Sequence, residues 1–262
     1  MSSKTVWITV LNKSRNEAAA KALYQTVSAY GLSVAGHFWE DLLEKLAWAG
    51  PREDLTRRET ALWIILGSAE DLAVGTVRYG LSLLAAGVHS MKGYGFPILI
   101  AVTEGELAAE SLPTQLKGAD VLAAGAASLG AKIAAKANLP LKKIEPEYRL
   151  DVHGLEGVGQ WFEVGPPPGR SWSGVMFGVS SGEINAHGVG SAHKLPERSV
   201  LEYPMQGLKL QLGEVEYTAW AVQNTLTDVD SYYLRVNDYP ASVLFGPLAQ
   251  GDDAEVFVVA LK

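Results

Sequence analysis

Short apolar runs alternate with longer stretches of helical periodicity over the first half of the chain. The run ALWIILG (61–67) is apolar throughout, which is typical of a strand buried on both faces of a parallel sheet. Predicted strands cover residues 5–11, 32–39, 61–67, 96–102 and 119–125. Predicted helices cover residues 16–31, 40–50, 69–90 and 127–139. This alternation predicts a three-layer α/β fold, in which right-handed crossovers join five parallel strands.

The pattern changes in the segment NLPLKKIEPE (138–147). Beyond it nothing has the pattern of a long helix, and short strand patterns follow one another between Gly, Pro, Asn and Asp turns. In YRLDVHG, Tyr148, Leu150 and Val152 fall on one face of a strand. Predicted strands cover 148–154, 160–164, 175–179, 183–189, 208–212, 216–224, 232–237 and 255–261. The last is apolar on both faces, which predicts a central strand.

We therefore expect two differently built domains. Residues 1–139 form an α/β domain whose five strands suit a flavodoxin-like order. Residues 140–147 form a linker. Residues 148–262 form an all-β sandwich or barrel, because short strands recur there at regular spacing.

Composition and charge narrow the functional classes. The 262 residues are 48% apolar and 19% charged, as in ordinary folded soluble proteins. Without cysteine, the chain has no disulfide, thiolate metal site or cysteine nucleophile. Residues 1–147 contain 15 basic and 15 acidic residues, and residues 148–262 contain 7 and 14, so the net charge of −7 belongs to the second half. An acidic surface repels phosphate backbones, which argues against nucleic acid as a partner of that half.

The sequence predicts neither a signal peptide nor a membrane span. The apolar stretch 6–11 is too short for a signal peptide and has no cleavage-like end. The longest apolar region, 72–88, contains Arg78 and several glycines, which favours a buried helix. We expect a cytoplasmic protein with no membrane partner.

Polar side chains follow the predicted strands at their carboxyl ends, where parallel sheets bind ligands close to a topological switch point. Lys13 and Arg15, near the start of the first helix, could hold an anionic group of a ligand. Glu70, Asp71 and Glu104 are the candidate acid/base or metal-binding groups if this rim is catalytic. The candidate ligand-binding residues are Asn12, Lys13, Ser14, Arg15, His37, Trp39, Ser68 and Arg78.

Helix initiation alone would also explain much of this polarity. The sequences SRNE (14–17), SAED (68–71) and TEGE (103–106) each match the capping box. In that motif the first and fourth side chains bond each other's backbone N–H groups at a helix start. Under this alternative the carboxylates begin helices and bind no ligand.

Motifs of the common nucleotide-binding folds are absent. No glycine fingerprint follows the first predicted strand, and there is no P-loop lysine or flavodoxin-type phosphate loop. The order of elements in 1–139, with Ser68 opening a long helix and Leu112-Pro113 followed by Leu116, resembles a Toll/interleukin-receptor (TIR)-type domain.

This resemblance implies either NAD cleavage or a scaffold or sensing role. Enzymatic TIR domains cleave NAD with a glutamate inside the helix after the third strand. Near that place this chain has Arg78 and Tyr79, and its nearest carboxylates, Glu70 and Asp71, stand at the helix start. The departure weakens the implied activity, whereas the scaffold and sensing roles remain.

The second half contains one apparent catalytic motif. Residues 178–182 match G-x-S-x-G, with His187, His193, Asp228 and Asp230 as imaginable partners. A nucleophile elbow needs a helix after the serine, whereas 183–187 predict a returning strand, so we interpret the motif as a hairpin turn. The histidines lack metal-ligand spacing, and Asn224, Asp228 and Asp230 are interpreted as turn residues rather than calcium ligands.

Two functional hypotheses remain. The first is a non-catalytic sensing or interaction protein, whose α/β domain binds a small anionic or nucleotide-like ligand or self-associates, and whose β domain (148–262) recognises a protein partner. The second is a NAD- or nucleotide-cleaving hydrolase that uses the rim carboxylates. Neither hypothesis calls for a resident cofactor or metal.

Overall fold

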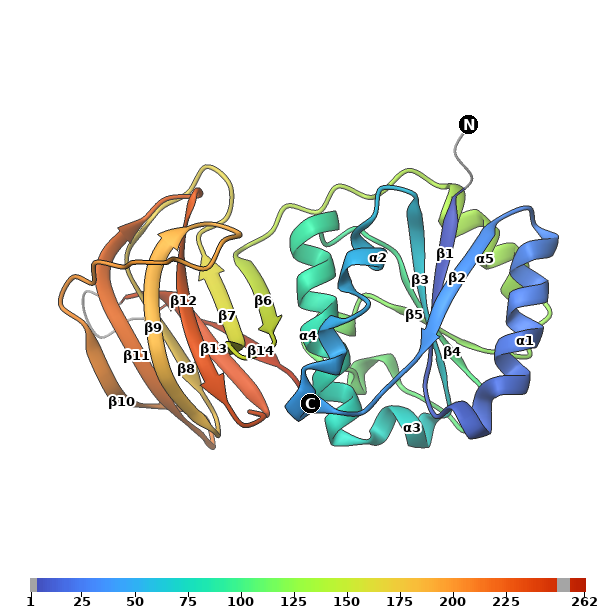
Figure 1. Cartoon of the computed structure of the whole chain (residues 1–262), viewed down its shortest axis with the longest axis horizontal. Coiled ribbons are helices and arrows are strands. Elements are labelled where there is room, and N and C mark those ends of the chain that lie inside the picture. The colour runs from blue at the N-terminus through green and yellow to red at the C-terminus, as the bar shows by residue number, and fades with distance from the viewer. Residues whose placement is uncertain (1–3, 249–254) are drawn as a thin grey trace. The chain divides into compact units, whose positions relative to one another are not determined.

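The computed structural model describes residues 4–248 and 255–262. The chain divides into two compact units, Met1–Ile144 and Glu145–Lys262, which we call the α/β unit and the β unit (Figure 1). The first contains a five-stranded parallel sheet with helices, and the second contains two antiparallel sheets. The expected combination of an α/β fold with an all-β fold is confirmed at this level.

The parallel sheet has a topological switch point beside its first strand. Its strands are β1 (Thr5–Val10), β2 (Ser33–Phe38), β3 (Thr60–Gly67), β4 (Ile98–Val102) and β5 (Asp120–Ala123). All are parallel and lie in the order β2-β1-β3-β4-β5. The chain runs outward from β1 to β2 and then returns to the other side of β1 for β3. The switch point therefore lies between the carboxyl ends of β1 and β3.

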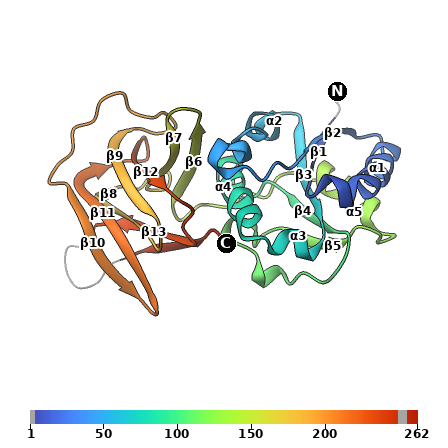
Figure 2. The ribbon, with the colours of Figure 1, turned by 60° about the horizontal axis from the view of Figure 1, so that its bottom comes forward.

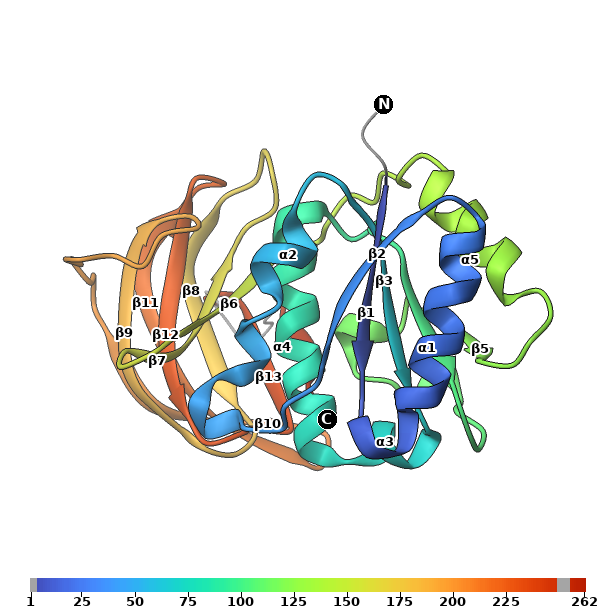
Figure 3. The ribbon, with the colours of Figure 1, turned by 45° about the vertical axis from the view of Figure 1, so that its right-hand side comes forward.

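Helices cover both faces of this sheet. They are α1 (Lys13–Ala29), α2 (Arg52–Thr56), α3 (Ala69–Ala73), α4 (Gly75–Lys92) and α5 (Leu129–Asn138). Figure 3 shows α1 and α5 on one face and α2 and α4 on the other. Val27 of α1 and Ile133 of α5 join Ile64 of β3 in one core cluster, and Leu84 of α4 joins Trp63 of β3 in the other. Successive residues of β3 thus enter opposite cores, which explains its uninterrupted apolar sequence.

Two predicted helical segments differ from the structure. The helix predicted over 40–50 is wrong: that segment forms 3₁₀ turns η1 (Leu43–Lys45) and η2 (Ala47–Ala49), separated by Leu46 in the left-handed conformation (φ 54°). The helix predicted over 69–90 divides at Val74, whose backbone is extended. The chain between β4 and β5 forms only short turns, η3 (Ala109–Ser111) and η4 (Thr114–Leu116).

The edge strand β2 depends on a glycine where it meets β1. A Cβ atom on Gly36 would lie 2.2 Å from the backbone oxygen of Ile8. No side chain fits at that distance, so Gly36 is required for β2 to pair with β1. Among the described strands β2 pairs only with β1, and this pairing positions His37 and Phe38.

The β unit consists of two antiparallel sheets that face each other (Figure 2). One sheet has the order β10-β11-β8-β13-β14 and the other β6-β7-β12-β9. Phe162 of β7 and Phe177 of β8 have ring centroids 5.4 Å apart, so side chains of the two sheets meet in a common core. The strands are β6 (Arg149–Leu155), β7 (Gly159–Gly165), β8 (Trp172–Val179), β9 (Glu183–Ser191), β10 (Met205–Leu212), β11 (Val215–Leu226), β12 (Asp230–Asn237), β13 (Ser242–Pro247) and β14 (Phe257–Ala260).

Two strand assignments at the end of the chain need correction. The sequence did not predict β13, which lies between β8 and β14, because Pro240 precedes it and Pro247 ends it, and prolines are typical of turns. β14 was expected to be central but pairs only with β13 among the described strands. Its two apolar faces differ in exposure. Phe257 packs on Tyr148 at a ring-centroid distance of 5.0 Å, while Val258 is 41% exposed.

Candidate functional site

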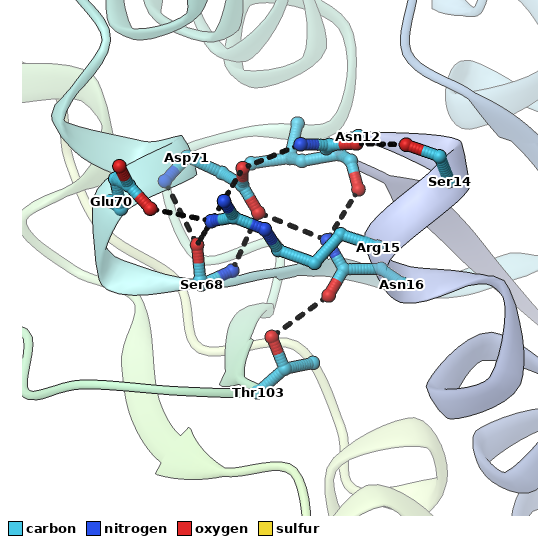
Figure 4. A network of polar contacts seen from close by, with 9 residues as sticks. Asn12, Ser14, Arg15, Asn16, Ser68, Glu70, Asp71 and Thr103 are labelled. Atoms are coloured by element: carbon cyan, nitrogen blue, oxygen red, sulfur yellow. Dashed lines mark hydrogen bonds and ion pairs between the residues drawn. The ribbon is translucent and has the colours of Figure 1, made fainter.

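The carboxyl ends of β1, β3 and β4 bring Asn12, Ser68 and Thr103 to the switch point. Together with Arg15, Asn16, Glu70 and Asp71 they form the polar network shown in Figure 4, which we call the rim network. Ligands of parallel sheets bind at this position. Whether the rim network can bind or react depends on which of its side chains already have partners.

Asp71 is the centre of the rim network. It is 7% exposed, and its Oδ2 accepts hydrogen bonds from the Ser68 backbone N–H and Asn16 Nδ2, both at 2.9 Å. Its Oδ1 accepts one from Asn12 Nδ2 at 3.3 Å. Burial alone raises the pKa of Asp71, but these hydrogen bonds to the ionised form outweigh burial and hold the pKa below its usual value. Asp71 is therefore an ionised anchor for two loops at neutral pH.

One of the three predicted capping boxes is confirmed. Ser68 Oγ accepts from the Asp71 backbone N–H at 3.0 Å, and the Asp71 side chain returns a bond to the Ser68 N–H at the start of α3. The box over 14–17 is wrong, because α1 begins at Lys13 after a left-handed Asn12 (φ 46°) that makes no side-chain cap. The box over 103–106 is wrong as well, because no helix begins there.

Ser14 and Thr103, which do not cap a helix, form hydrogen bonds with the rim network instead. Ser14 Oγ donates to Asn12 Oδ1 at 2.9 Å, and Thr103 Oγ1 donates to Asn16 Oδ1 at 2.9 Å. Asn16 was not among the predicted site residues. It is 1% exposed and also bonds the Leu11 carbonyl at 2.7 Å. The sequence could have indicated Asn16 as a buried polar residue, because helical spacing places it on the same face of α1 as Leu23 and Val27.

Arg15 closes the network toward solvent. Its guanidinium lies 2.6 Å from Glu70 Oε2, 3.2 Å from Ser68 Oγ and 3.7 Å from Asp71 Oδ1. The hydrogen bond and charge of Glu70, with the charge of Asp71, raise the pKa of Arg15. The side chain of Glu70 is 78% exposed and that of Arg15 41% exposed. An exposed pair of this kind is weak and exchangeable.

Beside Arg15 lies a cavity of about 370 Å³, which we call the rim pocket. Arg15, Ser68, Glu70, Glu104 and Gly105 line it with Ala69. The Ala69 backbone N–H donates to the Glu104 carbonyl at 2.9 Å, which joins the loops after β3 and β4. The pocket thus brings two of the three candidate carboxylates to one cavity.

Arg78 does not join the rim network or line the rim pocket. Its guanidinium donates to the Ser111 carbonyl, which ties α4 to the η3 turn. Its neighbour Tyr79 is completely buried. The part of α4 where the TIR resemblance would place a catalytic glutamate therefore contains a structural arginine and a core tyrosine.

His37 and Trp39 lie together at a second cavity of about 370 Å³, beside the edge strand, which we call the β2 pocket. Trp7 Nε1 is 3.1 Å from His37 Nδ1, and the Trp7–His37 and His37–Trp39 ring centroids are 5.8 and 6.3 Å apart. Burial lowers the pKa of His37 to about 4, although the charge of Asp54 opposes the shift. Lys13 Nζ lies 4.8 Å from the ring centre of Phe38, which also lines this pocket.

The lowered pKa of His37 predicts a loss of stability in mild acid. The unfolded chain takes up this proton near pH 6.5 and the folded chain only near pH 4. The contribution to stability is therefore complete above about pH 6.5 and lost as the pH falls to about 4, about 3 kcal/mol in total. Urea unfolding of the wild type and of His37→Phe should show pH profiles that diverge in this interval. Parallel profiles would contradict the expectation.

The G-x-S-x-G segment of the β unit is not a nucleophile elbow. Strand β9 follows it rather than a helix, and Ser180 Oγ exchanges hydrogen bonds with the Ser242 backbone at 3.0 and 3.1 Å. The predicted hairpin is also wrong, because β8 and β9 belong to different sheets. The segment is a tight link between the sheets.

The proposed partners of that serine and the calcium candidates have structural contacts of their own. His187 Nδ1 lies 2.7 Å from Tyr232 Oη, and the His193 N–H donates to Glu163 at 2.8 Å. The other three residues stabilise loops: Asn224 accepts from the Glu202 N–H, Asp228 from the Gly169 N–H and Asp230 from the Thr227 N–H. Asp228 therefore has the predicted turn role, whereas Asn224 lies within β11 and Asp230 begins β12.

No protein-family model matches the chain, and no curated protein matches it at a significant level. None of the helices in 4–248 and 255–262 combines the length and hydropathy that a bilayer span requires.

Proposed function

We propose that this protein is a non-catalytic sensing or interaction protein. Its α/β unit, flavodoxin-like or TIR-like, binds a small anionic or nucleotide-like ligand or associates with a second copy, and its β unit recognises a protein partner. The order β2-β1-β3-β4-β5 is that of flavodoxin-like sheets and supports this fold assignment.

The observation that carries the proposal is the engagement of Asp71. A general acid or base must exchange a proton with its substrate and works best with a pKa near the operating pH. Asp71 is buried, has a lowered pKa and already accepts bonds from Asn12, Asn16 and Ser68. Such a carboxylate organises the strand ends and is unsuited to proton transfer. Asp71, the acid at the centre of the rim network, therefore supports a binding role for the rim rather than a catalytic one.

Arg15 supports an anionic ligand. Its present partner Glu70 is largely exposed, so an entering phosphate or carboxylate can take the place of Glu70 at little energetic cost. A guanidinium accepts such groups through two parallel hydrogen bonds. Ser68 Oγ, 3.2 Å from the same guanidinium, adds a polar contact beside it.

One observation favours the alternative, a NAD- or nucleotide-cleaving hydrolase. Glu70 and Glu104 line the rim pocket together with Arg15. Two carboxylates at one cavity can divide the roles of acid and base, while an arginine holds a phosphate. The hydrolase would require the ion pair between Glu70 and Arg15 to break. Ligand binding in the first proposal requires the same.

Calorimetric titration of the full chain with ATP, ADP-ribose, NAD and inorganic phosphate tests both proposals. We expect at least one anionic nucleotide to bind and Arg15→Ala to weaken it about tenfold or more, as the loss of a charged hydrogen bond implies. Arg170→Ala, an exposed arginine of the β unit, is the matched control and should bind as the wild type does. Chromatography of the same mixtures should show intact nucleotide.

Two outcomes would change the conclusion. Nucleotide turnover that disappears in Glu70→Gln or Glu104→Gln would establish the hydrolase in place of the binding protein. Absence of any binding, together with a strict monomer in light scattering, would overturn the sensing proposal.

A further inference from the structure

The parallel sheet ends in an open edge at β2, which pairs only with β1 among the described strands. The N–H groups of Ser33 and Trp39 donate to carbonyls in and directly before β1. Along a strand the N–H and C=O groups of successive residues point in opposite directions within the sheet. The backbone groups that point away from β1 are therefore those of Val34, Gly36 and Phe38.

These backbone groups are accessible from solvent. Gly36 and Phe38 are exposed, and Val34 is half-buried. Because Gly36 has no side chain, its exposure is that of the backbone itself. The strand also contains no lysine, acidic residue or proline, the residues that usually prevent edge strands from pairing. An unprotected edge of this kind is a template for one further strand.

One face of this edge adjoins an apolar cavity of about 300 Å³ between β1, β2 and α1, which we call the α1 pocket. Ile8 and Val10 of β1, Tyr24 of α1 and Val34 of β2 line it. None of its described lining residues is an aspartate, glutamate, lysine or arginine. The complementary group is therefore an apolar side chain, whose burial there would be favourable.

The β2 pocket is acidic instead. Its lining includes Glu40, which is exposed, and Asp54, whose side chain is 34% exposed, so solvent reaches both carboxylates. Asp54 pairs with Arg57 at 2.9 Å, which leaves the charge of Glu40 in excess. Burial lowers the pKa of His37 to about 4, so this histidine adds no positive charge at neutral pH. Carboxylates beside an aromatic ring such as that of Trp39 favour a guanidinium or ammonium group.

The two pockets lie on opposite faces of the same strand. The α1 pocket includes Ile8 and Val10 of the core beneath α1, and the β2 pocket includes Trp7 of the core beneath α4. Gly36 and Phe38 line both pockets. Side chains of an added strand alternate between the faces, so neighbouring residues of one extended segment would reach one pocket each. In such binding, main-chain hydrogen bonds give affinity and the pockets select side chains.

We propose that the open edge of β2 binds an extended peptide segment of a protein partner in which an apolar and a basic residue are neighbours. The peptide backbone pairs with the outward N–H and C=O groups of Val34, Gly36 and Phe38. The apolar side chain enters the α1 pocket, and the basic one enters the β2 pocket beside Glu40 and Asp54. This inference goes beyond the proposed function, because neither pocket shares a lining residue with the rim pocket.

Fluorescence anisotropy of labelled peptides titrated with the full chain tests the proposal. The peptides are about six residues long, the length of a typical strand. One alternates valine with arginine, and the other alternates valine with glutamate. We expect the arginine peptide to bind and the glutamate peptide to bind at least about tenfold more weakly. Two further arginine peptides carry N-methyl groups on one or the other alternate set of backbone nitrogens. One set faces β2 and should abolish binding, whereas the other should leave it unchanged.

Variants of the chain locate the binding. Val34→Pro removes an N–H group that points away from β1, so it should abolish peptide binding and preserve the pairing with β1. Glu40→Gln combined with Asp54→Asn should weaken the arginine peptide about tenfold. Glu216→Gln is the matched control for a lost carboxylate, because Glu216 is 60% exposed in the β unit, and it should bind as the wild type does. The N-methylated peptides leave the protein unchanged, so they keep the test decisive if a variant fails to fold.

Several outcomes would overturn the proposal. Equal binding of the arginine and glutamate peptides, or equal binding of the two N-methylated peptides, would exclude the proposed pairing, as would failure of the arginine peptide to bind. A dimer in light scattering that Val34→Pro converts to a monomer would assign the edge to a second copy instead. The nucleotide titration with Arg15→Ala remains a separate test of the proposed function, because Arg15 lines neither pocket beside β2.

Discussion

Replacement of Glu163 by alanine is expected to lower the free energy of unfolding of the β unit by about 3–5 kcal/mol. Glu163 lies on β7 and is 2% exposed. Its carboxylate accepts from Ser231 Oγ and the His193 N–H at 2.8 Å and contacts His153 Nε2 at 2.7 Å. The substitution leaves these buried or half-buried donors without an acceptor, which is the most costly way to break a buried polar network.

The ionisation of Glu163 sets the direction of its pH dependence. Burial alone raises its pKa, but the hydrogen bonds from His153, His193 and Ser231 outweigh burial, and the pKa lies below the usual value. The contribution of Glu163 to stability is therefore present above the usual glutamate pKa and lost as the pH falls through the lowered one. An ionised carboxylate can only accept, so His153 Nε2 donates the hydrogen bond.

Urea unfolding followed by tryptophan fluorescence, with hydrogen exchange of the β7 peptide, measures the effect of Glu163→Ala. Glu163→Gln preserves the shape and one acceptor and should fall between the wild type and the alanine variant. Glu216→Ala is the control for a lost carboxylate, because that residue is 60% exposed in an ion pair with Lys209 and should change stability by less than about 1 kcal/mol. A loss below 1 kcal/mol for Glu163→Ala would show that the network relaxes or admits water.

The second large effect concerns Asp71. Asp71→Ala is expected to destabilise the α/β unit by about 2–4 kcal/mol, since it removes a helix cap and leaves buried donors of Asn16 and Ser68 unpaired. The pKa of Asp71 is lowered, so its contribution exists above the usual aspartate pKa and is lost as the pH falls. The acid sensitivity of the variant should therefore be smaller than that of the wild type.

Glu70→Ala is the matched control for Asp71→Ala, one residue earlier on α3. Its partner Arg15 and Glu70 itself are exposed, so a change of less than about 1 kcal/mol is expected. Thermal and urea unfolding at neutral pH and near pH 4 measure both variants. Equal effects of the two substitutions would contradict the structural role assigned to Asp71.

The sequence predicted where the candidate site lies, but it did not predict which of its side chains contact each other. Lys13, Arg15, Ser68 and Glu70 follow strand ends, and a parallel sheet brings strand ends to one edge, so a polar rim could be expected. Local patterns cannot decide between a helix cap and a ligand contact. Of three sequences that match the capping box, only the one at Ser68 forms it, because α1 begins at Lys13 after a left-handed Asn12 and no helix begins within 103–106.

The side-chain contacts beside the β2 pocket could not have been inferred from the sequence. Trp7 and His37 are 30 positions apart, and their hydrogen bond exists because β1 and β2 pair in a particular register. That register places Trp7 opposite Ala35, and the chain beyond Phe38 then carries Trp39 across to α4.

Apolar periodicity is a local property, and it was sufficient for the α/β and all-β architecture and for nearly every strand. Periodicity failed for the last two strands. β14 is apolar on both faces yet lies at the edge of its sheet among the described strands, and the prolines near both ends of β13 are typical of turns. Strand order, register and the pairing of Arg15 with Glu70 depend on contacts between residues far apart in the chain. Only the tertiary structure decides these, because each is selected by the packing of all elements together and no short stretch of sequence contains that information.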